Sequence, residues 1–162
     1  MAVDMFLKIS GVDGESTDQS HKGEIDILSW SWGMSQSGTT HVGGGGGSGK
    51  VSVQDITLTK YVDASSPALL LSCCKGTHLD QAVLVVRKAG ESPLEYIKLT
   101  MNEVIVSQLA TGGRGGEDRL TETLTLNFAE FKFEYQTQSR KGGKEGGARI
   151  AAWNIAENAA AG

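Results

Sequence analysis

The sequence predicts a mainly β protein that contains one α-helix. Segments rich in Val, Ile, Thr, Trp and Tyr recur along the chain, and apolar residues alternate with polar residues in them, which is typical of strands. The 22 glycines and only 2 prolines favour glycine-built turns between such strands. One short segment, residues 63–76, carries the start and stop signals of a helix instead.

Composition sets the protein class. A chain of 162 residues with 39% hydrophobic and 21% charged residues is expected to form a single globular domain over 1–162. The net charge of −4 argues against nucleic acid or an anionic membrane as the main partner. No run approaches the roughly 18 apolar residues that a membrane helix needs, so membrane insertion is not expected. The first residues lack the features of a secretory signal, which predicts cytoplasmic synthesis and export only by a signal-peptide-independent route.

Seven strands are expected along the chain. They cover residues 3–9, 25–32, 51–61, 81–88, 94–101, 103–110 and 119–136. In the second, third and last of them the apolar positions shift by one residue, which moves the apolar set to the other side of the sheet. Either a bulge re-aims each strand, or one half of the strand faces the core and the other half a neighbouring subunit. Three such shifts favour self-assembly.

The expected helix has Ser66 as its N-cap, Pro67 at its first position and Gly76 as its stop. Three consecutive leucines and the cysteines are expected to form one broad apolar side. Cys73 and Cys74 are adjacent, so they are poorly placed for an unstrained disulfide. They are interpreted as small apolar residues in a reducing compartment.

A glycine-rich loop interrupts the two most strand-like segments. It contains Gly43, Gly44, Gly45, Gly46, Gly47, Ser48 and Gly49. Glycine loses the most backbone freedom on ordering, so we expect contact with another subunit to order this loop. Residues 44–50 match the G-x-x-x-x-G-K pattern, but Val51 stands where a phosphate-binding loop needs Ser or Thr, and a strand follows instead of a helix. Nucleotide binding is therefore not expected.

No catalytic or metal-binding set emerges from the sequence. His21, His41 and His78 occupy unrelated loops, and no serine lies in a G-x-S-x-G pattern. His21 is expected to be solvated. The apolar surroundings of Cys73 disfavour the thiolate that a pair with His78 would need. We expect no enzyme activity, no metal and no cofactor.

Several long strings then resemble a known family. AVDMFLKI, EIDILSWSWGMSQSG, GKVSVQDITLTKYVD and GGEDRLTETLTLNFA closely resemble the haemolysin-coregulated protein (Hcp) family of bacterial type VI secretion systems, over residues 2–154. The resemblance implies a two-sheet β-barrel with one flanking α-helix and a homohexamer with a wide channel. It also implies stacked rings inside a contractile sheath, ejection with spike proteins, and small effector proteins carried in the channel.

Within that picture, Ser29 and Ser31 are expected to face the ring lumen and contact effectors. The alternative is that they simply alternate outward on a strand. Trp30 and Trp32, on the opposite face, are expected in the core or at a subunit contact.

Other surfaces are assigned to assembly. The glycine-rich loop is expected at ring–ring or subunit contacts, and Gly90 and Glu91 are expected in a turn at the rim. The charged cluster Glu117, Asp118 and Arg119 is interpreted as a subunit contact or a charged turn. The main alternative function is a monomeric β-sandwich ligand-binding module that uses the glycine-rich loop and a tryptophan. A small hydrolase is a third possibility, for which the sequence offers no residues.

Overall fold

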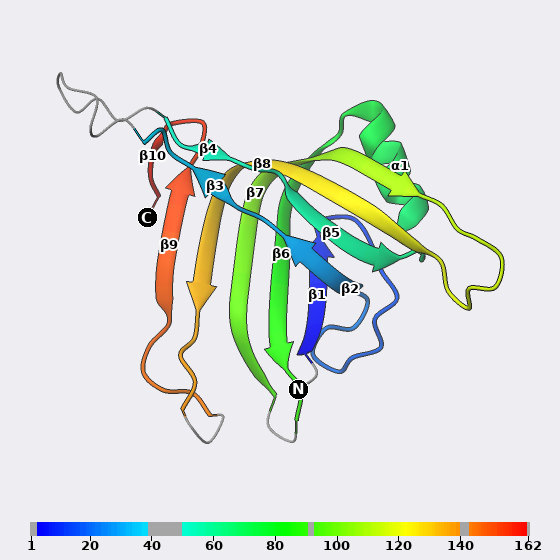
Figure 1. Ribbon diagram of the computed structural model, residues 1–162, viewed down its shortest axis with the longest axis horizontal. Helices are drawn as coiled ribbons and strands as arrows, with labels where there is room; N and C mark the ends of the chain where they lie inside the picture. The colour runs from blue at the N-terminus through cyan, green and yellow to red at the C-terminus, as the bar shows by residue number, and fades with distance from the viewer. Residues whose placement is uncertain (1–2, 39–49, 91–92, 140–142, 162) are drawn as a thin grey trace.

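The computed structural model describes residues 3–38, 50–90, 93–139 and 143–161. Eight strands form one sheet in the order β10-β9-β8-β5-β2-β1-β6-β7, and pairing of β7 with β8 closes the portion from β8 to β7 into a barrel (Figure 1). The strands of this sheet are β1 Val3–Ile9, β2 Ile25–Ser31, β5 Ile56–Tyr61, β6 His78–Lys88, β7 Leu94–Thr111, β8 Thr121–Tyr135, β9 Arg149–Asn154 and β10 Ala159–Ala160. A separate two-stranded arm contains β3 Met34–Ser35 and β4 Ser52–Val53, and the helix is α1 Ser66–Lys75.

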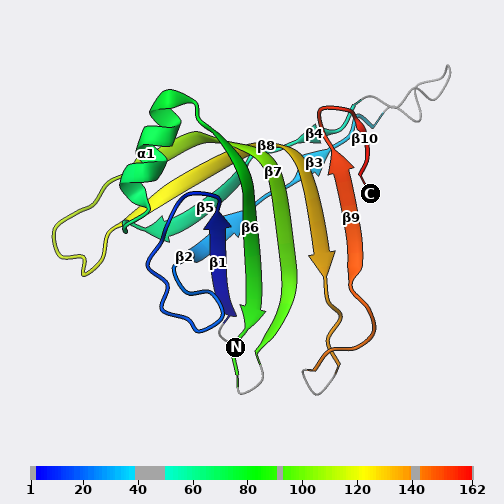
Figure 2. The ribbon, with the colours of Figure 1, turned by 180° about the vertical axis from the view of Figure 1, so that it is seen from behind.

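The sheet branches at β8. This strand pairs with β7 along its length, with β5 over residues 121–126 and with β9 over residues 130–135. As a result β9, β10 and the arm lie at one end of the molecule, and α1 lies at the other (Figures 1 and 2). The predicted β-barrel with one flanking helix is confirmed.

Each strand of the barrel, β1, β2, β5, β6, β7 and β8, contributes side chains to the core. Its fully buried members include Leu7, Ile25, Ile56, Leu58, Leu84, Leu99, Met101, Val104, Leu124 and Leu126. Most of these residues occupy alternate positions of their strands, as period-two patterns require, but Met101 and Val104 are three residues apart because Glu103 interrupts the alternation in β7. Trp153 and Ile155 of the C-terminal segment pack against the same core.

The predicted strands are present with three corrections, and β3, β9 and β10 were not predicted. Strand β6 begins at His78, which was expected in a loop, and not at residue 81. Residues 94–101 and 103–110 belong to one strand, β7, although Glu103 adopts a positive φ of 54° in its middle. Glu103 lies between the pairs Asn102–Glu130 and Val104–Phe128. At this level β8 also loses its alternation, since its buried residues Phe128 and Phe131 are three positions apart. The predicted strand 51–61 is divided at Gln54 into β4 and β5.

The apolar phase shift in β2 has a local cause. The pairing with β5 slips between Ile27 and Ser29, so Leu28 is an extra residue in β2. A β-bulge of this kind re-aims the following side chains. For β2, the bulge interpretation is confirmed.

The helix begins one residue earlier than expected. Its N-cap is Ser65, whose hydroxyl makes no capping bond and donates to the Asp63 carboxylate instead. The Ser66 hydroxyl accepts from the Asp63 N–H and donates to Glu122. Gly76 ends the helix in the left-handed conformation, as predicted. The expected broad apolar side is wrong, since Leu69 is buried but the next two leucines are exposed.

His21 is also not the solvated loop residue that was expected. Only 6% of its surface is exposed, because the loop that contains it packs on the Phe6 ring of β1 and is bound to Arg87 of β6 through Asp18. Its ring stacks on Phe6 with centroids 4.4 Å apart. The polar sequence of the loop gives no sign of this burial, because the residues that contact His21, Phe6 and Glu95, belong to strands.

Candidate functional site

Small hydroxyl side chains cover the outward side of three neighbouring strands, β2, β5 and β8. We call this surface the hydroxyl face. The strand register arranges its residues in two rows, Ser29–Thr59–Thr123 and Ser31–Thr57–Thr125. Directly paired residues of an antiparallel sheet share a face, so the predicted Ser29 and Ser31 are the β2 members of rows that cross three strands.

The fold fixes the direction of these hydroxyls. Between the two rows, Trp30, Leu58 and Leu124 form a paired row that points the other way. Leu58 and Leu124 are fully buried and Trp30 packs against the core. Because successive side chains alternate across a strand, burial of this row turns the hydroxyls outward.

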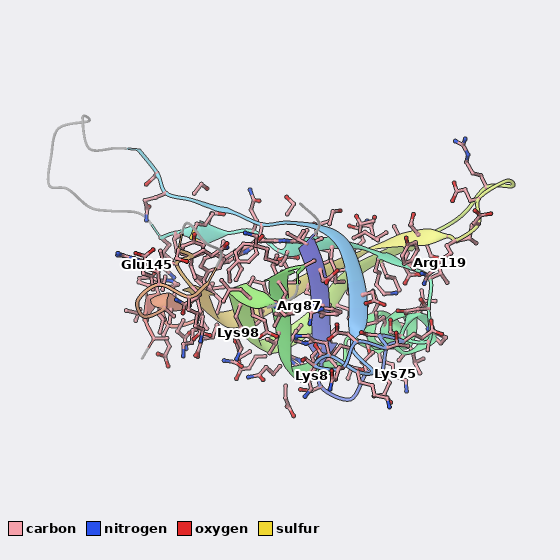
Figure 3. The ribbon with its side chains drawn as sticks, turned by 90° about the horizontal axis from the view of Figure 1, so that it is seen from below. Lys8, Lys75, Arg87, Lys98, Arg119 and Glu145 are labelled. Carbon is pink, nitrogen blue, oxygen red and sulfur yellow. The ribbon has the colours of Figure 1, made fainter. Side chains whose placement is uncertain are left out.

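The hydroxyl face is uncharged across both rows. At one border the Asp55 carboxylate accepts hydrogen bonds from Ser107 Oγ and Asn127 Nδ2, each at 2.8 Å. The sheet face formed by β1, β6, β7 and the second half of β8 differs, since it carries Lys8 and Lys98 (Figure 3). Exposed faces of antiparallel sheets are usually polar and rich in charge, so the neutral hydroxyl surface is a distinguishing feature.

The chemistry available on this face is hydrogen bonding. A hydroxyl donates one hydrogen bond and accepts two, but it becomes a nucleophile only beside a general base. The paired neighbours within both rows are other hydroxyls. Among the described residues, no group of three or more His, Cys, Asp or Glu side chains could hold a metal ion. The face therefore suits contact with water or with a polar protein surface.

Trp30 and Trp32 lie on the core side of β2 and of the segment after it. The Trp32 Nε1 donates to the Gln54 carbonyl oxygen over 2.9 Å. Its ring packs edge-on against Phe131, with centroids 4.8 Å apart. Of the two expected locations, core or subunit contact, the structure places both tryptophans against the core.

The charged cluster of residues 117–119 lies in an exposed loop at the α1 end (Figure 3). The Arg119 guanidinium carbon lies 3.6 Å from the ring centroid of Tyr61, which follows Thr57 and Thr59 on the outward side of β5. Glu117 lies 3.7 Å from the Arg114 Nε, and Asp118 is exposed. The cluster thus borders the hydroxyl face but does not enter it.

The remaining predicted positions are only partly described. Gly90 is exposed in the turn after β6, where its φ of 152° favours glycine. Glu91 and residues 43–49 lie outside the described residues.

Two hollows lie away from the hydroxyl face. A polar cavity of about 300 Å³ lies beside the 10–24 loop and contains His21 among its lining residues. An apolar groove of about 310 Å³ lies at the end with the arm, lined by Met34, Val53, Phe131 and Trp153 among others.

Charged groups anchor the 10–24 loop. The Arg87 guanidinium donates to both oxygens of Asp18 and to Asp4. Its hydrogen bonds lower the pKa of Asp18 to about 2, and the same bonds raise the pKa of Arg87. Burial raises the pKa of Asp26, which pairs with Phe6.

Comparison with known proteins agrees with this architecture. The family model described as "Type VI secretion system effector, Hcp" matches residues 6–135. The chain is 57% identical over 159 residues to protein hcp1 of Pseudomonas aeruginosa, covering 98% of each chain. The chain belongs to the Hcp family.

Solved Hcp structures share the fold. Hcp1 from Salmonella typhimurium is 41% identical with a TM-score of 0.82, covering 99% of this chain and 100% of its own. A type VI secretion system effector from Yersinia pestis is 33% identical with a TM-score of 0.76, covering 94% of this chain and 100% of its own. Hcp proteins are secreted, structural components of type VI secretion systems. Within the described residues, no helix is long and apolar enough to cross a membrane.

Only Ser29 and Ser31, the β2 part of the hydroxyl face, were predicted from the sequence. The other members, Thr57, Thr59, Thr123 and Thr125, were not predicted. A signal was present, because threonines recur at every second position in ITLTKY and TETLTL. What the sequence lacked was the register that aligns these strands.

Proposed function

We propose that this protein is a structural subunit of the inner tube of a type VI secretion system. In this function six copies form a ring, rings stack into a tube, and the subunit is itself secreted. Membership of the Hcp family supports the proposal. The proposed role is a structural one.

The hydroxyl face is the observation that carries the proposal, as the surface lining the channel. A channel wall must remain wet and must not hold a passing protein permanently. Neutral Ser and Thr side chains exchange hydrogen bonds with water at little net free energy, whereas large apolar or charged surfaces bind more strongly. We therefore assign Ser29 and Ser31, with the four threonines of their rows, to the lumen, where small effector proteins would contact them.

Ring closure needs two different surfaces on each subunit, because the contact is head-to-tail. The apolar groove is lined by residues of the arm, and the exposed Leu70 and Leu71 belong to α1. The arm and α1 lie at opposite ends of the molecule (Figure 1). Glu117, Asp118 and Arg119 project at the same end as α1 and would join this contact. Trp30 and Trp32 would support it only from the core side.

Stacking and export involve further surfaces and partners. We assign Gly90 and Glu91 to the ring rim, and Gly43–Gly49 to contacts between rings or subunits. The outside of the tube would face the contractile sheath, and the spike proteins would cap its tip. Export would follow the tube through the envelope without an N-terminal signal.

Electron microscopy of the purified protein tests assembly directly. Rings with open centres are expected, and light scattering should give the mass of six subunits. A monomer at high concentration would contradict the proposal and would favour a free-standing β-sandwich binding module.

A labelled ring tests the orientation. In a background with Cys73→Ser and Cys74→Ser, Ser31→Cys should place a maleimide gold label inside the ring in averaged images. Lys8→Cys, on the other sheet face, is the matched control and should place the label outside. Gold on the outer surface for Ser31→Cys would overturn the lumen assignment.

Where an effector co-purifies with wild-type rings, Ser31→Trp should reduce its retention while rings still form.

A further inference from the structure

The 10–24 loop is held on the outer side of the barrel through a buried histidine. His21 is 6% exposed and its ring lies parallel to Phe6 of β1, at an interplanar angle of 11°. Among the described residues, the backbone hydrogen bonds of residues 14–24 stay within the loop, such as Gly23 N–H to the Ser16 carbonyl at 2.8 Å and Ser16 N–H to the Glu24 carbonyl at 2.9 Å, and none reaches β7. Side-chain contacts must therefore supply much of the attachment at this point.

Both nitrogens of the His21 ring face carboxylates from different segments. Nδ1 lies 3.0 Å from Glu24 Oε2, at the end of the loop, and Nε2 lies 2.6 Å from Glu95 Oε1, at the start of β7. A neutral imidazole carries one N–H donor, whereas the imidazolium carries two. Because an ionised carboxylate only accepts, both hydrogen bonds form together when each ring nitrogen carries a proton.

Two lysines face the cavity in which the two carboxylates lie. Lys8 of β1 and Lys98 of β7 line the same polar cavity as His21, Glu24 and Glu95. Opposite charges nearby favour the charged form of a carboxyl group. The proton that completes the second hydrogen bond therefore belongs on the imidazole ring.

A second attachment of the loop does not depend on this proton. Arg87 binds Asp18 and Asp4, and it holds the pKa of Asp18 at about 2. That ion pair remains charged throughout the neutral range. The loop thus has one fixed attachment at Asp18 and one attachment at His21 that varies with protonation.

We propose that His21 is a proton-dependent clasp between the 10–24 loop and the first residues of β7. With two ring protons, it bridges Glu24 and Glu95. When one proton leaves, one ring nitrogen presents a lone pair to a carboxylate oxygen, and that side of the bridge opens. The segment around residues 20–24 then separates from β7 while Asp18 stays attached to Arg87. The clasp is a property of the subunit and does not require ring formation.

Hydrogen–deuterium exchange of the full-length protein tests the clasp. Spectra are recorded over about pH 5 to 8, where a histidine ring exchanges its second proton, and are corrected for intrinsic exchange. Amides of residues 20–24 should lose about tenfold protection as the pH rises. Amides of buried β6 should not change. In His21→Gln, protection of residues 20–24 should be low and independent of pH.

His78→Gln is the matched control, because His78 is an exposed histidine on β6. It should retain the wild-type pH profile. Glu95→Gln should also flatten the profile, whereas Glu103→Gln, an exposed carboxylate of the same strand, should not. A pH-independent profile in the wild-type protein, or an unchanged profile in His21→Gln, would refute the clasp. If any variant exchanges faster throughout the barrel, nitrogen NMR of the His21 ring in the wild-type protein decides: a neutral ring throughout this pH range excludes the bridge.

Discussion

At the scale of single residues, the barrel interior contains a lysine with no solvent exposure. The Lys60 Nζ lies 2.8 Å from Glu122 Oε2 and 3.1 Å from Asp63 Oδ1. It also donates to the Tyr61 carbonyl oxygen and lies 3.3 Å from Ser66 Oγ. These bonds join β5, β8 and the start of α1. Removing one charge of such a cluster leaves its partner buried and unpaired, which is more destabilising than removing both.

We expect Lys60→Met to lower the free energy of unfolding by about 3–5 kcal/mol. The double variant Lys60→Met with Glu122→Leu should lose less, since no carboxylate is then stranded at Glu122. Urea unfolding followed by tryptophan fluorescence measures both. Equal losses of unfolding free energy in the single and double variants would show that an unpaired, buried Glu122 carboxylate is not the cause of the destabilisation.

The lowered pKa of Asp18 predicts that the free energy of unfolding depends on pH in the acid range. Its pKa is lowered to about 2 by Arg87, below the value of about 3.9 for an unfolded chain. The unfolded state therefore binds a proton first, so the stabilisation is complete above about pH 4 and is lost as the pH falls towards 2. Asp18→Asn should remove this part of the acid dependence in unfolding titrations. Asp13→Asn, at an exposed site of the same loop, should leave the titration unchanged.

Residue-scale predictions from sequence succeeded where local pattern was sufficient. Ser29 and Ser31 were placed on the outward side of β2 because alternation is a local property. The burial of His21 was missed because its partners Phe6 and Glu95 are distant in sequence. Long-range contacts of loops leave no periodic signal.

At the scale of elements, glycine determines where α1 ends. Gly76 adopts φ 62° and ψ 36°, and its N–H and that of Thr77 bond back to the last turn. A Cβ at Gly76 would meet no atom within 4 Å, so only backbone strain opposes substitution. This isolates the conformational cost of a left-handed residue.

Gly76→Ala should therefore destabilise the protein by about 1 kcal/mol, and Gly76→Asn should cost less because Asn tolerates this conformation. Thermal unfolding of the variants checks the values. Gly112→Ala is the control, since Gly112 has no positive φ and open space at its Cβ. A loss as large for Gly112→Ala would mean that strain at the helix end is not the cause.

The type of most elements could be predicted from the sequence, but the points where strands begin, end or continue could not. Strand β1 matches its predicted bounds because its alternation is uninterrupted. Residues 94–111 were divided in two because Asn102 and Glu103 interrupt the apolar pattern, yet ladder bonds to β6 and β8 continue past them. Pairing with neighbouring strands outweighs a local break in pattern.

At the scale of the whole molecule, the barrel and the arm are separate hydrogen-bonded units. β3 pairs with β4 through Met34–Val53 and Ser35–Ser52, and neither strand belongs to the eight-stranded sheet. The resemblance to a family predicted the barrel, which the structure confirms, and a hexameric assembly, which stays a prediction. The hydroxyl face was recognised only from the pairing of the strands. The glycine-rich sequence connects the two strands of the arm, so changes there should leave the barrel core in place.

Deleting Gly43–Gly47 should therefore separate folding from assembly. The deletion removes no residue of the barrel core, so the free energy of unfolding should change by no more than about 0.5 kcal/mol. Assembly should weaken if this segment makes the proposed contact with a neighbouring subunit or ring. Urea unfolding measures the first effect, and electron microscopy with light scattering measures the second. Gly44→Ser with Gly46→Ser keeps the length and should retain assembly. If the deletion variant forms tubes as the wild-type protein does, the glycine-rich segment has no role in assembly, and the surfaces at the arm and α1 ends must suffice for it.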